Sequence, residues 1–157
     1  MKKKFSERTI LLFATGFYTG YAPIAPGTFG TLLGIPLGFL VSRLNITNQI
    51  LLIFIGFFIF SKIAGKAEEY LGKKDAGQIV CDEAVGFVVS MFLIPYTLFN
   101  IIIVFFLFRF FDILKPFPIR MIDQKIKNGY GVVLDDVLAG VYANIAFHIL
   151  MIGRGYV

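Results

Sequence analysis

The sequence has 157 residues, of which 57% are hydrophobic and only 16% charged, and its formal net charge is +5. Its mean hydropathy is +0.80. About a quarter of the residues in an average soluble domain are charged, so this composition argues against a soluble fold. Nucleic-acid binding is excluded as well, because the basic residues flank apolar segments and accompany no RNP-like or zinc-finger pattern. Cys81 is the single cysteine and rules out an internal disulfide.

Four uncharged runs dominate the chain, at residues 9–42, 44–61, 84–108 and 137–153. Each is long enough to cross a bilayer, which takes about 20 mainly apolar residues with a lower limit near 17. We therefore expect an all-α, polytopic membrane bundle that occupies residues 1–157 as one domain. No cleavage pattern of a signal peptide follows the basic start, so we expect that start to hold the N-terminus at the cytoplasmic face.

The first run is interrupted by Pro23, Pro26 and Gly27. Since proline breaks a helix, residues 9–22 are predicted to form a short re-entrant or interfacial helix. Non-helical backbone at membrane depth has to be covered by protein or water. The loop 22–30 is therefore expected to line a cavity.

About five spans are expected after this interruption. The segment around Pro95 is predicted to be a hairpin of two helices and not one kinked span, because both of its flanks are rich in lysine. The positive-inside rule places both flanks in the cytoplasm, which requires the chain to return. The last helix is expected to begin between residues 132 and 136. The expected spans cover residues 27–44, 49–65, 78–94, 97–114 and 132–152.

The hairpin predicts a cluster of charged residues near one membrane face. Pro95 lies about midway in the sequence between Asp82 and Glu83 on one side and Arg109 and Asp112 on the other. In a hairpin that turns at Pro95, the two groups should therefore lie at the same depth. Ionisable groups at that depth cost roughly 3 kcal/mol or more and normally mark function. Clustered carboxylates repel one another unless a cation or protons neutralise them. The expected cluster of carboxylates comprises Asp82, Glu83, Asp112, Asp135 and Asp136.

Some of these residues could serve a structural role and not a functional one. Asp135 could cap the last helix, and Arg109 with Asp112 has the i, i+3 spacing of a salt bridge inside the bundle. Asp123 has the spacing of a surface ion pair with Arg120 or Lys127.

Two prolines, at 116 and 118, are expected to end a helix at about Lys115. Lys115 and Arg120 would then lie at a rigid helix exit facing the headgroup layer. They are suited to hold a lipid phosphate, or alternatively to extend towards the headgroups as ordinary interfacial cations.

The residue types indicate metal-assisted phosphate chemistry. Carboxylate oxygens suit Mg²⁺. His148 is the only histidine and is interpreted as structural, so histidine ligands for zinc are lacking and zinc is an unsuitable metal. The chain contains no Cys-x₅-Arg, Asp-x-Asp or Walker A pattern. For a phosphatase, attack by a metal-activated water is the first mechanism to consider, and an aspartate nucleophile the second.

Four stretches resemble the phosphatidylglycerophosphatase A family: GFYTGYAPIAPGTFGTLLGIPLG, IVCDEAVGF, FRFFDILKPFPIRMID and GVVLDDVLAGVYA. They occur in the family's order between Gly16 and Ala143. The resemblance implies a small Mg²⁺-dependent enzyme of the bacterial inner membrane, multi-pass and with its active site facing the cytoplasm. Its lipid substrate would be phosphatidylglycerophosphate and its product phosphatidylglycerol.

The resemblance also implies roles for particular residues. Asp82, Glu83, Asp112 and Asp136 become catalytic or metal-binding carboxylates, joined by Asp135 as a metal ligand. The residues implied in phosphate or headgroup binding are Arg109, Lys115, Arg120, Gly27, Thr28 and Gly30.

Two other functions fit the composition less well. A small cation or proton-coupled transporter would need acidic residues through the whole bilayer depth, whereas here they gather near one face. A phosphatidyltransferase would need its Asp-Gly-x₂-Ala-Arg signature, which the sequence lacks. The glycine-rich spans favour association between copies of the chain without fixing a stoichiometry.

Overall fold

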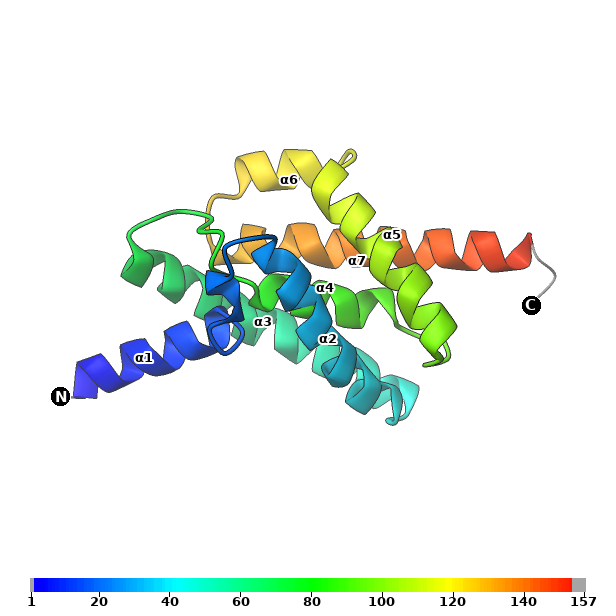
Figure 1. The fold of residues 1–157 in the computed structure, drawn as a ribbon, viewed down its shortest axis with the longest axis horizontal. Helices are drawn as coiled ribbons and strands as arrows, with labels where there is room; N and C mark the ends of the chain where they lie inside the picture. Colours follow the sequence, from blue (N-terminus) through cyan, green and yellow to red (C-terminus); the bar gives the residue numbers. More distant parts are fainter. Residues whose placement is uncertain (1, 154–157) are drawn as a thin grey trace.

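The computed structural model describes residues 2–153, with side chains from residue 6 onward. In this part of the chain the structure contains helices and no strand, which confirms the all-α prediction. The described residues form seven α-helices and one 3₁₀ turn, η1, and Figure 1 shows how the helices are arranged. Their bounds are α1 Lys2–Ala14, η1 Thr19–Tyr21, α2 Pro26–Ser42, α3 Ile46–Leu71, α4 Cys81–Ser90, α5 Leu98–Leu114, α6 Ile119–Lys125 and α7 Gly129–Ile152.

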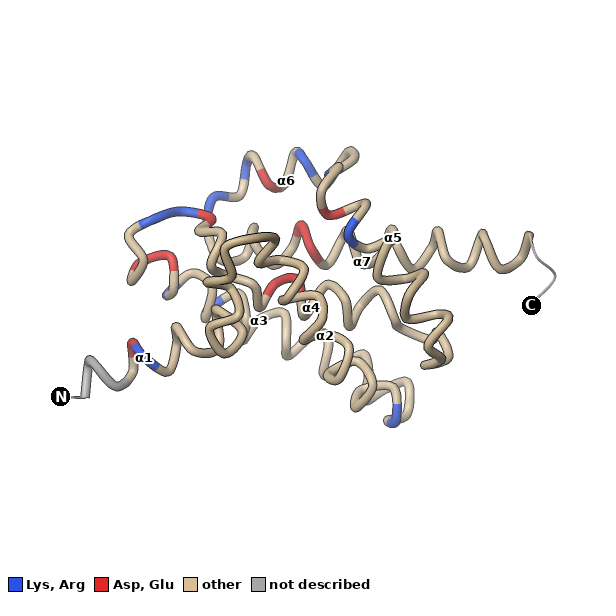
Figure 2. The backbone as a smooth tube through the Cα atoms, in the orientation of Figure 1, with Lys and Arg blue, Asp and Glu red and all other residues tan. Residues whose placement is uncertain are grey.

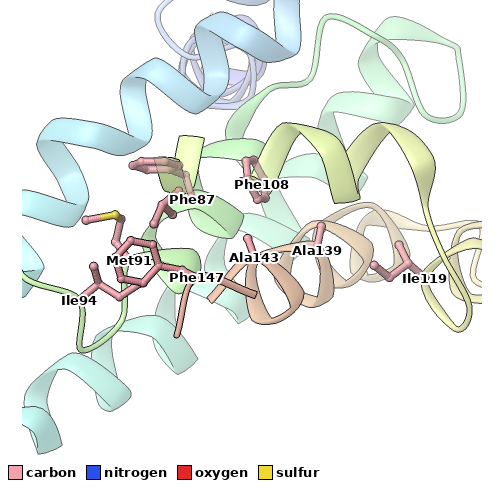
Figure 3. Packing of buried hydrophobic residues seen from close by; sticks show 9 residues of the cluster. Phe87, Met91, Ile94, Phe108, Ile119, Ala139, Ala143 and Phe147 are labelled. Carbon is pink, nitrogen blue, oxygen red and sulfur yellow. The ribbon is translucent and has the colours of Figure 1, made fainter. Parts of the chain in front are cut away.

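Helix α4 lies at the centre of the bundle and packs mainly against α7 and α2. The contact with α7 is made backbone to backbone, since a Cβ added at Gly140 would lie 2.3 Å from the carbonyl oxygen of Gly86. Below this contact, α4, α5 and α7 enclose an aromatic core that includes Phe87, Phe108 and Phe147 (Figure 3). The core fixes the relative positions of the three helices that carry Asp82, Glu83, Asp112, Asp135 and Asp136.

The N-terminal segment differs from the prediction. Helix α1 ends at Ala14, and Gly16, Phe17 and Tyr18 all adopt positive φ angles, which turn the chain before η1. A single helix over residues 9–22 is therefore wrong. Positive φ at consecutive residues is incompatible with a right-handed helix, and the apolar character of this segment conceals that break.

The expected count of five spans is not confirmed. Two helices, α3 with 26 residues and α7 with 24, are long and apolar enough to cross a membrane. Helix α2 is apolar but shorter, at 17 residues. Helix α4 has ten residues and is about 15 Å long, roughly half the hydrocarbon thickness. The hairpin is present, but its first arm ends at Ser90 and not at residue 94.

Helix α7 begins earlier than predicted. Its N-cap is Asn128, whose side chain accepts hydrogen bonds from the amides of Tyr130 and Gly131. Asp135 therefore lies within the helix, almost two turns from its start, and the alternative role as a cap is wrong. The sequence pattern conceals this start because Gly129 and Gly131 lower the apparent helix propensity of the first turn.

The charged residues gather at one end of the bundle. Figure 2 shows them around the start of α4, the end of α5, α6, the loop after α3 and the first turns of α7. Between Thr9 and Ser61 the sequence has one charged residue, Arg43, which follows the last turn of α2. Within this uncharged stretch, the surface of α3 is apolar and exposed, with Phe54 and Phe58 among its large exposed side chains.

Candidate functional site

Three carboxylates converge where α4 meets α7. Asp82 and Glu83 occupy the first turn of α4, and Asp136 faces them from α7. One oxygen from each side chain lies within 4.8 Å of the other two. We call these three residues the carboxylate trio. Asp112 and Asp135, expected in the same cluster, lie outside this group.

The carboxylate trio has oxygens that the described residues leave without a hydrogen-bond partner. They are Oδ1 of Asp82, Oε2 of Glu83 and Oδ2 of Asp136, and all three are buried. Buried polar atoms are nearly always paired, so three converging unpaired acceptors require an explanation. A hard divalent cation such as Mg²⁺ takes oxygen ligands and neutralises their repulsion, and this donor set fits such a cation.

Arg109 places a cation beside the carboxylate trio. Its Nη1 lies 2.5 Å from Oδ2 of Asp112, one turn further along α5, and 4.0 Å from Oε1 of Glu83. The predicted i, i+3 salt bridge is therefore present, and it also faces the carboxylate trio. Asp112 holds the guanidinium group of Arg109 in place next to the carboxylate trio.

Two glycines of α2 form the wall beside Glu83. A Cβ at Gly27 would lie 2.2 Å from Oε1 of Glu83, and one at Gly30 would lie 2.6 Å from the carbonyl oxygen of Val80. These glycines are needed for close packing of α2 against α4, which the sequence alone does not reveal. Thr28, predicted beside them, is half-buried, and its amide donates to the carbonyl of Ala25.

Lys115 belongs to a second charged group. It follows the last residue of α5 with φ 43°, and its ammonium group binds Asp135 of α7 and, at 3.0 Å, Asp123 of α6. Burial by itself would lower the pKa of Lys115, but the two carboxylates outweigh it and raise the pKa above its ordinary value. Lys115 therefore links the end of α5 to α6 and α7.

Asp123 is a residue that the sequence interpretation missed. Its predicted partners were Arg120 and Lys127, but it pairs with Lys115. The two prolines reverse the chain after α5, so that α6 packs on α7 and returns Asp123 to the helix exit. The prolines were the available signal for this reversal.

The other predicted residues, Asp135, Arg120 and His148, lie at different distances from the carboxylate trio. Asp135 links the two groups, because one oxygen binds Lys115 and the other accepts the amide of Asp136 at 3.1 Å. Arg120 is exposed on α6 and is not brought to the carboxylate trio. His148 lies near the far end of α7, where its Nδ1 is 2.9 Å from the carbonyl oxygen of Asn144, in agreement with a structural role.

Comparisons with known proteins identify the family of the chain. The sequence pattern of the family described as Phosphatidylglycerophosphatase A matches residues 12–151. Phosphatidylglycerophosphatase A of Haemophilus influenzae is 42% identical over 145 residues, which is 91% of this chain and 89% of that protein. Phosphatidylglycerophosphatase A of Escherichia coli is 34% identical over 131 residues, 83% of this chain and 76% of that protein.

A protein of Bacteroides thetaiotaomicron, provisionally named phosphatidylinositol-3-phosphatase, is 40% identical over 144 residues, 85% of this chain and 87% of that protein. No solved structure matches the fold significantly. The family match covers the helices that carry Asp82, Glu83, Asp112, Lys115 and Asp136. The chain belongs to the phosphatidylglycerophosphatase A family of lipid phosphatases.

Proposed function

We propose that the protein removes the terminal phosphate of phosphatidylglycerophosphate, giving phosphatidylglycerol and inorganic phosphate. The names of the two relatives supply the substrate. The observation that carries the proposal is the carboxylate trio with its three unpaired oxygens beside the Arg109–Asp112 pair. An acidic group combined with a fixed cation is what a metal-dependent phosphomonoesterase requires.

Asp82, Glu83 and Asp136 would hold Mg²⁺. When bound, the ion would polarise a phosphate oxygen and lower the pKa of a bound water. Arg109 binds a non-bridging phosphate oxygen, because guanidinium groups match phosphate geometry. Asp112 orients Arg109 and, outside the carboxylate trio, is available to accept the proton of the attacking water. Lys115 contributes positive charge at the helix exit, while Asp135 holds it in position.

The same proposal places the chain in the bacterial inner membrane with the site facing the cytoplasm. The charged ends of α3, α4, α5 and α7 lie on one side of the bundle (Figure 2), and residues 62–74 and 115–127 contain seven of the ten lysines. Lysine-rich segments remain on the cytoplasmic side. The transporter alternative is not favoured, because the acidic residues occupy this one end.

Phosphate release by the purified full-length chain tests the function. With phosphatidylglycerophosphate in detergent micelles we expect Mg²⁺-dependent release that EDTA abolishes. Asp136→Asn should lower turnover by more than about 100-fold, because it removes a proposed metal ligand. Asp75→Asn is the matched control, since it makes the same chemical change at an exposed residue, and its turnover should remain normal.

Two outcomes would contradict the proposal. If the folded protein releases no phosphate in the presence of Mg²⁺, the proposed phosphatase activity is refuted. Equal turnover in Asp136→Asn and Asp75→Asn would remove Asp136 from the site. Phosphatidylinositol 3-phosphate belongs in the same assay because one relative is named for it. Faster release from that lipid would reassign the substrate while keeping the site.

A further inference from the structure

A pocket with charged residues in its lining lies between the end of α3 and the start of α7. Its volume is about 580 Å³. The wall from α3 includes Ser61, Lys62 and Lys66, the loop after α3 contributes Lys74, and Gly129 begins the opposite wall on α7. None of these residues belongs to the carboxylate trio or to the charged group around Lys115. The proposed phosphatase reaction uses none of them.

Ser61 is the first indication that this pocket receives a ligand. The residue is 1% exposed, and its hydroxyl has no hydrogen-bond partner among the described residues. Ser61 nevertheless lines the pocket. A buried hydroxyl without a partner is destabilising, and an acceptor atom bound in the pocket would satisfy it.

The start of α7 supplies a second donor. The first amides of a helix have no partner within it, and the side chain of Asn128 accepts those of Tyr130 and Gly131. Gly129 is a buried residue, and its amide makes no hydrogen bond to another described residue. Gly65 on α3 lies opposite and has no side chain to cover it. The positive end of a 24-residue helix adds to the attraction for an anion.

The lysines give the pocket a net positive charge. Lys66 is neutralised by Glu69 at 2.7 Å, and the carboxylate of Glu68 accepts the amide of Asp75 at 2.7 Å. Lys74 donates to the carbonyl oxygen of Lys127 at 2.8 Å, which leaves its charge uncompensated. Lys62 has no ion pair among the described residues. Lys62 and Lys74 are thus free of ion pairs among the described residues, and the three lysines and two glutamates of the lining give the pocket a net charge of +1.

We propose that this pocket binds the phosphate group of an anionic phospholipid. It lies at the charged ends of the two helices that are long and apolar enough to cross a membrane. Tyr130 lines it and contacts the rings of Phe57 and Phe58, an aromatic arrangement typical of the headgroup layer. Basic pockets between membrane helices on the cytoplasmic side are recognised sites for anionic headgroups. Free inorganic phosphate offers the same chemistry and is the other source to test.

The test measures binding of phosphatidylserine to the full chain in detergent by native mass spectrometry, with phosphatidylcholine as the zwitterionic comparison. Phosphatidylserine is anionic and is not the proposed product. We expect selective binding of phosphatidylserine, weakened about 30-fold in Lys62→Gln/Lys74→Gln, since each lysine near an anionic headgroup contributes about a fivefold factor. Lys73→Gln/Lys125→Gln, at exposed lysines outside the pocket, is the matched control for net charge.

Gly65→Ala tests the amide without removing charge. Its Cβ would lie 3.6 Å from the Gly129 nitrogen, an ordinary contact that leaves the fold intact but covers the donor. We expect weaker phosphatidylserine binding in this variant and normal phosphatase turnover, because neither pocket variant touches the carboxylate trio. Displacement of the lipid by millimolar phosphate would identify the phosphate group alone as the ligand, and retention would identify the whole headgroup.

Equal weakening in the pocket variant and the net-charge control would overturn the proposal, as would equal binding of the two lipids. Both readouts are independent of turnover. A chain without phosphatase activity could still show the selective binding, so failure of the proposed function is distinguishable from failure of this inference.

Discussion

Glu83 is the residue at which three helices meet. It lies in the first turn of α4, 4.0 Å from Arg109 of α5, and is approached so closely by α2 that Gly27 has no room for a side chain. Its Oε2 has no hydrogen-bond partner among the described residues. A single carboxylate thus joins the proposed metal position, the guanidinium group and the α2 wall, and small changes around it should have large effects.

Gly27→Ala tests that wall. The added Cβ would lie 2.2 Å from Oε1 of Glu83 and 3.0 Å from Nη1 of Arg109, so one of these side chains has to move. We expect phosphate release to fall by about 100-fold, because displacements of about 1 Å at a site have effects of this size. The measurement is turnover per folded protein in the Mg²⁺ assay.

Gly56→Ala is the matched control for Gly27→Ala. Gly56 is also a helical glycine, but nothing lies within 4 Å of its added Cβ. Turnover should be normal, and stability unchanged or higher by up to about 1 kcal/mol, the helix propensity difference. Similar losses in the two variants would mean that the contact with Glu83 is unimportant.

At the scale of elements, the sequence predicted helix identity better than helix length. Uncharged runs and prolines located α2, α3, α5 and the hairpin. The end of α4 at Ser90 was not predictable, because residues 91–94 continue the apolar pattern although they form a turn, from which Met91 and Ile94 pack into the core. The start of α7 was hidden by Gly129, which packs α7 against α3, a tertiary contact that overrides local propensity.

The hairpin implies that the turn between α4 and α5 and the helix α6 lie on opposite sides of the membrane. Leu98 begins α5 and is 75% exposed, whereas Gln124 is exposed on α6 at the charged end. In intact cells, Leu98→Cys should react with a membrane-impermeant maleimide, and Gln124→Cys should react only after permeabilisation. Native Cys81 is buried and contributes little background. Labelling of both positions from the same side would refute the hairpin.

At the scale of the whole molecule, the site depends on tertiary packing. The positions of Asp82, Glu83, Arg109 and Asp112 at one depth follow from the hairpin, which the sequence predicts. The division into the carboxylate trio and the group around Lys115 does not follow, because it is determined by the rotation of α7 and the return of α6. Sequence patterns give the depth of a residue in a bundle but not its direction around the helix axis.

Metal binding should stabilise the whole bundle, since the carboxylate trio joins α4 to α7. A ligand that binds only the folded state adds about 2.7 kcal/mol at 100 times its Kd. We therefore expect Mg²⁺ to raise the Tm of the purified protein and EDTA to reverse the change. Asp82→Asn should lose most of this shift, and Asp75→Asn should keep it. An identical Mg²⁺ shift in both variants would place the ion elsewhere.

The short α4 has a consequence for the permeability of the membrane. The carboxylates stand at the start of a helix that reaches about halfway across, and beneath them Phe87, Phe108, Met91 and Phe147 fill the space with tightly packed apolar side chains. In the proposed orientation this hydrophobic plug insulates the site from the far side. A bacterial cell could then bring a highly charged phosphate and a divalent ion into this bundle without opening a leak for protons or cations across its energised membrane.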